Sequence, residues 1–282
     1  MPLNPDAVGT TTDPSPTSWD SKDALLYAVG IGAGTDELAF ATENTSGVDQ
    51  QVFPTFPVVV STGSAAALGS IGTFNPAMLV HGSQSVTLYK PLPVNGAVHV
   101  SSRIANMWDK GKAAVVVIEN SATDDTDGEL LYTTTMSAFI RGEGGWGGER
   151  GPSGPQNVPP ERDPDHVVEY QTSPDQALVY RLSGDRNPLH SDPSFAAMGG
   201  FDRPILHGLC TYGFTGRALL HELCGSDPAR FRSMEGRFSS PVMPGEDLTV
   251  QMWRTDDGAA VYRTLASGDR VVLDSGAVTF DA

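Results

Sequence analysis

The sequence has few of the residues that mark several common classes of protein. Only two of its 282 residues are cysteine. Two are too few for a disulfide framework, so Cys210 and Cys224 are predicted to be core thiols. Lysine and arginine number 18 against 34 aspartates and glutamates, which gives a formal charge of −16. Because no basic stripe is present to neutralise a phosphate backbone, nucleic acid is an unfavourable partner.

Segments that would target or anchor the chain, or hold a cofactor, are also missing. No apolar run is long enough to span a bilayer, and no basic region followed by an apolar one opens the sequence. The final Thr-Phe-Asp-Ala is not a peroxisomal address. No Cys/His/Asp spacing matches a metal site, and no Gly-rich phosphate loop follows a predicted strand. We therefore expect a cytoplasmic bacterial protein with no membrane contact, no metal and no nicotinamide.

What the sequence does contain is a polar turn rich in chemically active side chains. Asp185, Asn187 and His190 stand within six residues, and His207-Gly208 follows at the head of an apolar run. Asp192-Pro193 is typical of a helix start, which places the first three residues in the loop before that helix. Two interpretations are open at this point. The segment is either a side-chain-capped turn or a set of side chains that converge on a ligand.

The segment resembles the signature of the type 2, or (R)-specific, enoyl-CoA hydratases of the MaoC-like group. The matching positions are Tyr180, Leu182, Ser183, Gly184, Asp185, Asn187, Pro188, Leu189 and His190. The likeness continues through PILHGLCTYGFTGRAL and RFSSPVMPGE, and it reaches the first half in VHGSQSVTLYKPLP, WDKGKAAVV and FIRGEGGWGG. It therefore covers practically the whole chain.

The resemblance implies an α+β double hotdog, in which each half wraps an antiparallel sheet around a helix. An internal duplication supports this independently, since DALLYAVGIGAG and QALVYRLSGDRN align without gaps and each is followed by a His-Gly pair. Alternating or β-branched runs predict the strands: AVHVSSRI, AAVVVIEN, TTTMSAFI, DLTVQMW, AVYRTLA and VVLDSGAVTF. The Gly/Pro-rich stretch that follows the first half predicts a linker at 146–164 between domains 1–145 and 165–282.

The two halves differ at the polar turn. Gly32 aligns with Asp185 and Glu37 with His190, while Gly34 takes the place of Asn187. One active site per chain is therefore expected, and replacing Gly32 with Asp should not create a second. Residues 38–80 make the first half longer. We interpret them as a remodelled core that admits an acyl chain, and the alternative is a surface loop.

Hydration of an enoyl thioester needs a held water, proton transfer groups and donors for the thioester oxygen. Asp185 and His190 can clamp the water as base and acid, and either can take the first proton. Asn187 is expected to orient the pair or the water. The Gly208 amide, at a predicted helix N-terminus, is the candidate oxyanion donor.

The resemblance also implies residues that line the substrate and its coenzyme A moiety. These are His81, Gly82, Lys110, Arg186, Pro188, Leu189, His207 and Phe238. Arg103, Lys112 and Arg203 are further candidates for the phosphates. No resident cofactor is expected, because coenzyme A belongs to the substrate.

The sequence thus predicts a hydro-lyase of lipid metabolism, an (R)-specific 2-enoyl-CoA hydratase that acts as a homodimer. One alternative is a 3-hydroxyacyl-thioester dehydratase acting on acyl-carrier-protein or steroid-side-chain thioesters. Another is a non-catalytic acyl-CoA binding subunit, which the intact Asp185, Asn187 and His190 disfavour. A hotdog thioesterase is also disfavoured, since it would consume the thioester.

Overall fold

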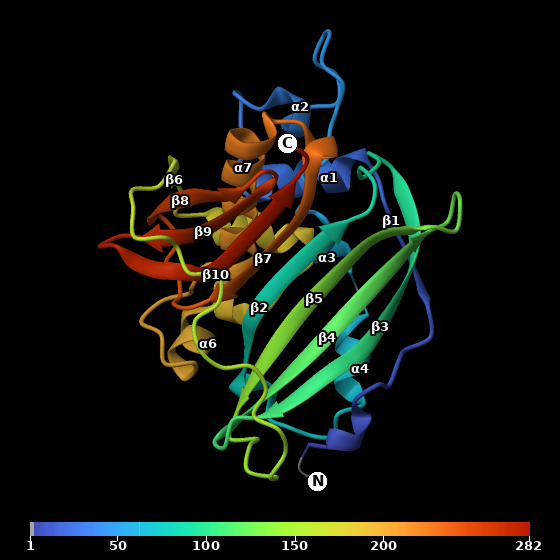
Figure 1. Cartoon of the computed structure of the whole chain (residues 1–282), viewed down its shortest axis with the longest axis vertical. Coiled ribbons are helices and arrows are strands. Elements are labelled where there is room, and N and C mark those ends of the chain that lie inside the picture. The colour runs from blue at the N-terminus through green and yellow to red at the C-terminus, as the bar shows by residue number, and fades with distance from the viewer. Residues whose placement is uncertain (1–2, 62) are drawn as a thin grey trace.

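Ten strands form a single antiparallel sheet in the computed structural model, which describes residues 3–61 and 63–282 (Figure 1). The strands are β1 (Ser15–Trp19), β2 (Leu79–Leu88), β3 (Gly96–Asp109), β4 (Ala113–Asp124), β5 (Leu130–Arg141), β6 (His166–Gln171), β7 (Phe231–Phe238), β8 (Asp247–Asp256), β9 (Ala259–Ala266) and β10 (Arg270–Phe280). The helices are α1 (Ser21–Gly30), α2 (Leu38–Ala41), α3 (Pro57–Val60), α4 (Ser64–Gly69), α5 (Gln176–Tyr180), α6 (Pro193–Met198) and α7 (Gly208–Cys224). Each of the six predicted strands is confirmed.

The strand order of the sheet is symmetric about its centre. Its order is β1-β3-β4-β5-β2-β7-β10-β9-β8-β6, so each strand of the first half has a counterpart five strands later. The halves join where β2 pairs with β7, with Ser85 opposite Glu235. This symmetry confirms the predicted duplication and the double hotdog.

The two His-Gly pairs, however, do not occupy equivalent positions. His81-Gly82 lies within β2, whereas His207-Gly208 begins α7. Pairing them as repeat equivalents is therefore wrong. By strand order β2 is the counterpart of β7, so His81-Gly82 lies one element later in its repeat than His207-Gly208.

Helix α7 forms the centre of the core and packs against both halves. Of its 17 residues, only four are not buried, because sheet lies on one side and first-half segments lie on the other. A Cβ at Gly213 would lie 2.4 Å from Ile31, and one at Gly216 would lie 2.5 Å from Thr55. These two glycines let the first half approach the helix closely. The helix predicted from the apolar run after His207 is confirmed.

Among the described residues of the first half, no long helix fills the centre. Short α3 and α4 occupy that place, and α4 buries Ala67 in a second apolar cluster with Ile71, Ile104 and Ile118. This agrees with a remodelled core at 38–80, and the entry of an acyl chain there stays a prediction.

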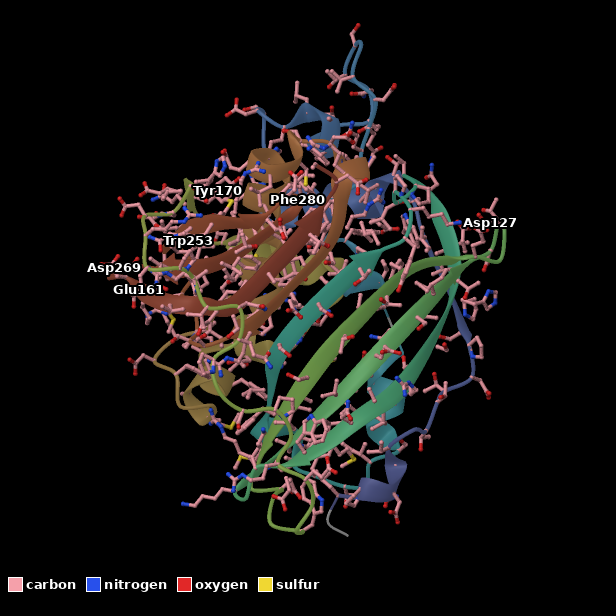
Figure 2. All side chains as sticks on the ribbon, viewed as in Figure 1. Asp127, Glu161, Tyr170, Trp253, Asp269 and Phe280 are labelled. Carbon is pink, nitrogen blue, oxygen red and sulfur yellow. The ribbon has the colours of Figure 1, made fainter. Side chains whose placement is uncertain are left out.

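The segment from 142 to 165, between β5 and β6, contains neither helix nor strand and runs across the front of the sheet (Figure 1). It is fastened to the second half, since Trp253 Nε1 donates to the Arg162 carbonyl at 2.9 Å. Figure 2 labels Trp253 and Glu161, which lie on the same side of the molecule.

Cys210 and Cys224 are buried free thiols, as predicted. Within the described residues, no helix is both long and apolar enough to cross a membrane.

Candidate active site

The polar turn after α5 is shaped by its own side chains. Asp185 Oδ1 accepts the Asn187 amide at 3.0 Å, and Asn187 Oδ1 accepts the Leu189 amide at 3.0 Å. Asn187 has the extended ψ of 122° expected before proline, and it caps a short 3₁₀ turn at Pro188–His190. The segment is therefore a side-chain-capped turn, and the same turn brings chemically active side chains together. Asn187 acts through the backbone, because its turn carries His190 back toward Asp185.

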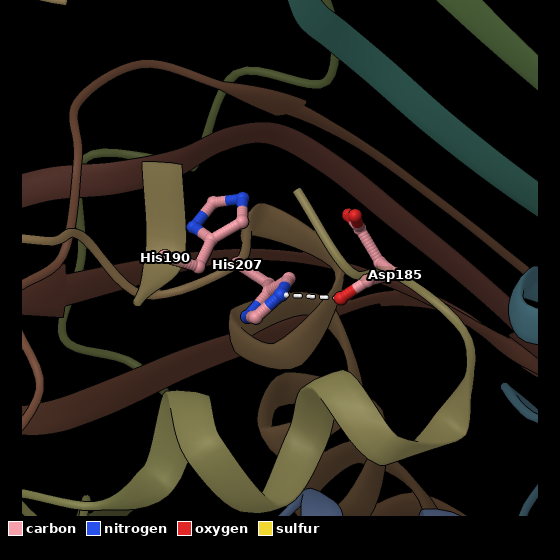
Figure 3. A group of neighbouring side chains, drawn as sticks. All are labelled: Asp185, His190 and His207. Carbon is pink, nitrogen blue, oxygen red and sulfur yellow. Dashed lines mark hydrogen bonds between the residues drawn. The ribbon is translucent and has the colours of Figure 1, made fainter. Parts of the chain in front are cut away.

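Three side chains from this region converge (Figure 3). Asp185, His190 and His207 each offer one polar atom, and these atoms lie within 4.8 Å of one another. Asp185 is exposed, whereas His190 and His207 are 8% and 1% exposed. The carboxylate therefore faces solvent while the imidazoles lie behind it. The sequence predicted that Asp185 and His190 would meet, and the structure brings them together.

The hydrogen bonds of His190 define which of its nitrogens is available. Nδ1 lies 2.8 Å from the carbonyl oxygen of Ile205. A carbonyl only accepts, so Nδ1 carries the proton and Nε2 presents its lone pair. Burial lowers the pKa of His190, although the Ile205 carbonyl and Asp185 act in the opposite direction. His190 is therefore a neutral imidazole at neutral pH.

His207 lies directly against His190. The ring centroids are 3.7 Å apart with an angle of 27° between the planes, and His207 Nε2 donates to the Asp185 carbonyl oxygen at 3.2 Å. Burial, reinforced by the neighbouring His190, lowers the pKa of His207 to about 4. From the sequence, His207 was expected only to line the substrate. Its contacts with Asp185 and His190, the pair called the dyad below, could be seen only in the tertiary structure.

This trio is the one group of three potential ligand residues found in the described part of the chain. Its geometry suits a metal poorly. One nitrogen of each ring is already engaged, since His190 Nδ1 lies 2.8 Å from the Ile205 carbonyl oxygen and His207 Nε2 donates to the Asp185 carbonyl oxygen. The absence of a metal stays a prediction.

Helix α7 begins beside the trio. Its first amides have no acceptor within the helix, and the N-cap residue His207 provides no side-chain cap. The Gly208 amide therefore points out of a 17-residue helix whose dipole favours negative charge there. A Cβ at Gly208 would lie 3.2 Å from the Phe238 ring, so the aromatic ring closes one side of this amide.

His81 approaches the same place from the first half. Its ring lies 5.0 Å from that of Phe238 at 69°, and Nε2 lies 3.0 Å from the Ser83 carbonyl oxygen. Burial lowers the pKa of His81 to about 4. A Cβ at Gly82 would lie 2.7 Å from Ser137 Oγ, so strand packing explains this glycine. His81 and Phe238 thus lie beside the α7 N-terminus, and their contact with the substrate stays a prediction.

The basic residues predicted for coenzyme A are not gathered at the dyad. Lys110 Nζ donates to the Pro152 carbonyl at 2.9 Å and lines a groove of about 490 Å³ that also contains Arg237 and Glu235 but no dyad residue. Arg103 pairs with Glu119 at 3.4 Å. Among the predicted cations, Arg186 is the exposed residue within the turn itself, next to Pro188 and Leu189.

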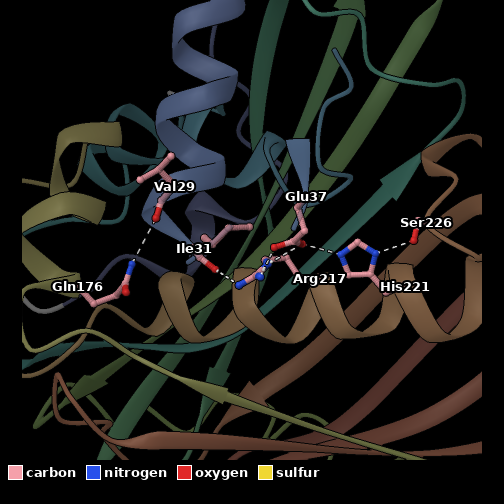
Figure 4. Close-up of polar contacts among 7 residues, drawn as sticks. All are labelled: Val29, Ile31, Glu37, Gln176, Arg217, His221 and Ser226. Carbon is pink, nitrogen blue, oxygen red and sulfur yellow. Dashed lines mark hydrogen bonds and ion pairs between the residues drawn. The ribbon is translucent and has the colours of Figure 1, made fainter. Parts of the chain in front are cut away.

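The aligned turn of the first half has become an ion-pair cluster (Figure 4). Glu37, opposite His190 in the repeat, bonds Arg217 and accepts from His221 Nε2 at 2.6 Å. Both partners come from α7 and line a cavity of about 700 Å³ with Glu37. Sequence reasoning missed this cluster. The signal was present, since Arg217 and His221 are spaced i, i+4 on a mostly apolar helix.

Gly32, opposite Asp185, cannot hold an aspartate in this fold. Its φ is +80° and a Cβ would lie 2.4 Å from the Phe214 ring. We expect Gly32→Asp to lower the free energy of unfolding by about 2–5 kcal/mol and to create no second site. Urea unfolding checks the first part, and calorimetric titration with a product analogue counts the sites. Two sites per chain in either protein would contradict the one-site prediction.

Comparisons with known proteins agree with this architecture. Residues 18–142 match the family model described as the MFE-2 hydratase 2 N-terminal domain, and residues 156–272 match the MaoC like domain. The chain is 49% identical to 3-hydroxyacyl-thioester dehydratase Y of Mycobacterium tuberculosis over 100% of both chains, and 43% identical to its Enoyl-CoA hydratase ChsH3 over 98% of both. The crystal structure of a MaoC-like dehydratase from Phytophthora capsici has a TM-score of 0.89 at 33% identity, covering 98% of this chain and 97% of that one.

Proposed function

Because the chain belongs to the MaoC-like hydratase family, with an MFE-2 hydratase 2 N-terminal domain before its MaoC-like domain, we propose that it is an (R)-specific 2-enoyl-CoA hydratase. Such a hydro-lyase adds water reversibly to a trans-2-enoyl-CoA and gives a (3R)-3-hydroxyacyl-CoA. One observation carries the proposal: the Asp185–His190 pair lies beside the free amide of Gly208.

The pair can activate a water molecule between its two side chains. His190 Nε2 accepts one proton of the water while the Asp185 carboxylate accepts a hydrogen bond from the other. The water oxygen bonds to the third carbon, and the π electrons move toward the thioester oxygen. The His190 imidazolium then returns its proton to the second carbon. The dyad is restored, and one molecule of water has been added.

The Gly208 amide stabilises the enolate in this scheme. Charge grows on the thioester oxygen as the water attacks, and a fixed amide at a helix N-terminus interacts more strongly with that charge than with a neutral carbonyl. The donor therefore acts mainly on the transition state.

We expect Gly208→Ala to lower kcat by roughly tenfold to hundredfold. The new Cβ would lie 3.2 Å from Phe238 and displace either the ring or the helix start, although the amide itself remains. Steady-state kinetics on an enoyl-CoA provide the measurement. Adding Phe238→Leu should recover part of kcat because it frees the space, and failure of this rescue would contradict the steric explanation.

The acyl group is proposed to enter the first half, where α3 and α4 replace a long helix. A cavity of about 200 Å³ there is lined by apolar Leu26, Phe56 and Val59 and reaches Ser183, two residues before Asp185. Lys110 and Arg186 remain the proposed partners of the coenzyme phosphates, with Arg103, Lys112 and Arg203 as further candidates.

The dehydration direction is the second candidate function. The 49% identity to a protein named 3-hydroxyacyl-thioester dehydratase Y favours it, and microscopic reversibility assigns the same residues to it. Substrates would then be 3-hydroxyacyl thioesters of a carrier protein, of coenzyme A or of a steroid side chain.

The remaining proposals concern cofactor, assembly and location. Addition of water is redox-neutral, so we propose that no nicotinamide takes part, and that Asp185 and His190 supply the proton transfers without a metal. We also propose a homodimer of double hotdogs in the bacterial cytoplasm. The mycobacterial relatives support a bacterial source, and sedimentation equilibrium tests the dimer.

The deciding assay follows the loss of enoyl-thioester absorbance with crotonyl-CoA and with a longer enoyl-CoA, together with the configuration of the product. We expect a product that an (S)-specific 3-hydroxyacyl-CoA dehydrogenase does not oxidise. Oxidation of the product by that dehydrogenase would contradict (R)-specificity. Loss of absorbance with neither substrate would favour a specialised acyl group or a binding role.

A further inference from the structure

We infer that His207 is a positioning residue for the dyad: it fixes the Asp185 backbone through Nε2 and holds the His190 ring in place by stacking. The inference rests on the proposed function, because it assigns the dyad the catalytic role. His207 itself is not placed in contact with the reacting atoms.

Two independent contacts link His207 to the two dyad residues. Nε2 donates to the Asp185 carbonyl oxygen at 3.2 Å, and the ring lies 3.7 Å from the His190 ring. Asp185 sits in an exposed turn whose hydrogen bonds are otherwise local. The bond from His207 therefore ties this turn to the start of the rigid helix α7 (Figure 3).

The other nitrogen of His207 argues against a role in packing alone. Nδ1 is fully buried and has no hydrogen-bond partner within the described residues. An unsatisfied buried acceptor costs about 1–3 kcal/mol, which a phenylalanine in this space would avoid. A residue kept only for packing would not carry this cost.

The charges around His207 keep it neutral while His190 works. The groups that face it are His190, Asp185, Arg181 and the buried Tyr180, whose ring centroid lies 5.0 Å away. Burial acts together with His190 and Arg181 against a second positive charge. When His190 accepts the proton of the water, His207 stays uncharged and continues to donate to Asp185. The stacked pair therefore carries one charge at a time.

Two substitutions separate the two contacts. His207→Gln retains a donor in the place of Nε2 but removes the ring, whereas His207→Phe retains a ring against His190 but removes the donor. We expect each to lower kcat by roughly tenfold to hundredfold while KM changes less than about threefold. The matched control is His99→Gln, since His99 is an exposed histidine paired with Asp125. It should leave both parameters unchanged.

A second measurement does not depend on activity. Proton–carbon NMR of the histidine rings reports the titration of His190, which is assigned by its absence in His190→Gln. We expect the midpoint to rise toward 6.5 in His207→Gln, because loss of the ring admits water. It should stay low in His207→Phe, where an apolar ring still covers His190.

The outcomes separate cleanly. A fall in kcat with the divergent His190 titrations supports the inference. Near-normal kcat in both variants overturns it, as does a His190 midpoint that stays at its wild-type value in His207→Gln while circular dichroism shows that this variant is folded. If the wild-type protein hydrates no enoyl thioester, the proposed function fails, and the NMR titrations still decide whether His207 fixes His190.

Discussion

Replacing His190 with Gln should lower kcat by about 10²–10⁴ while the protein stays folded and still binds the coenzyme A thioester. Glutamine can occupy the space, but it cannot take a proton from water, and the present His190 offers Nε2 for that purpose. Asp185→Asn should cause a loss of the same order, because an amide binds the water without carrying negative charge. Stopped-flow or steady-state rates with an enoyl-CoA measure both.

The same assignment predicts the pH dependence. The active form of His190 is neutral, and burial lowers the pKa of its imidazolium. Activity should therefore persist below the ordinary histidine pKa of 6.5 and fall only as pH drops through the lowered value. An acid limb of kcat/KM that lies at or above 6.5 would contradict a buried His190 base.

Binding must be measured beside the rates. Calorimetric titration of each variant with a saturated acyl-CoA should give a Kd within a few-fold of the wild-type value, and His99→Gln again serves as a control. Near-normal turnover by either dyad variant would remove that residue from the mechanism. Loss of turnover together with loss of binding would point to a collapsed site and would not support the dyad.

Local sequence chemistry was sufficient to predict most of the elements. Asn187-Pro188 and Asp192-Pro193 define their turn and helix start through bonds within a few residues, and the structure shows both. The strand at 113–120 could be predicted from its β-branched apolar run alone, although only the structure shows which alternate residues are buried. The apolar run after His207 likewise predicted α7.

Contacts between residues that are far apart in the sequence could not be predicted from local patterns. Nothing near His207 in the sequence shows that its ring stacks on His190, because the chain between them forms α6 and a loop. Lys110, on the turn between β3 and β4, lines a groove together with Arg237, and its contact with the coenzyme stays a prediction. The repeat alignment placed Glu37 opposite His190, but it could not show the partners of Glu37, since Arg217 and His221 lie 180 and 184 residues away.

That cluster should make Glu37 one of the most stabilising charged residues of the chain. Glu37 and Arg217 are 13% and 5% exposed, and Arg217 also donates to the Ile31 carbonyl at 2.7 Å and lies 4.4 Å over the Tyr170 ring. Glu37→Leu would leave the guanidinium buried without its counter-charge. Removing one partner of a buried pair costs about 3–5 kcal/mol, so we expect a loss of this size in urea unfolding.

The double variant Glu37→Leu with Arg217→Met should be more stable than Glu37→Leu alone, because no unpaired charge remains. As a control, Arg232→Met breaks an exposed pair with Asp281 and should lower the free energy of unfolding by less than about 1 kcal/mol.

The contribution of Glu37 to stability should depend on pH. Burial by itself would raise the pKa of Glu37, but hydrogen bonds from His221 and Arg217 outweigh it and lower that pKa below 4.5. The pair therefore stabilises the protein above pH 4.5, and its contribution is lost as pH falls through the lowered value. The stability gap between wild type and Glu37→Leu should narrow in acid. A gap that is small at neutral pH, or that widens in acid, would show that this buried ion pair does not hold the two halves together.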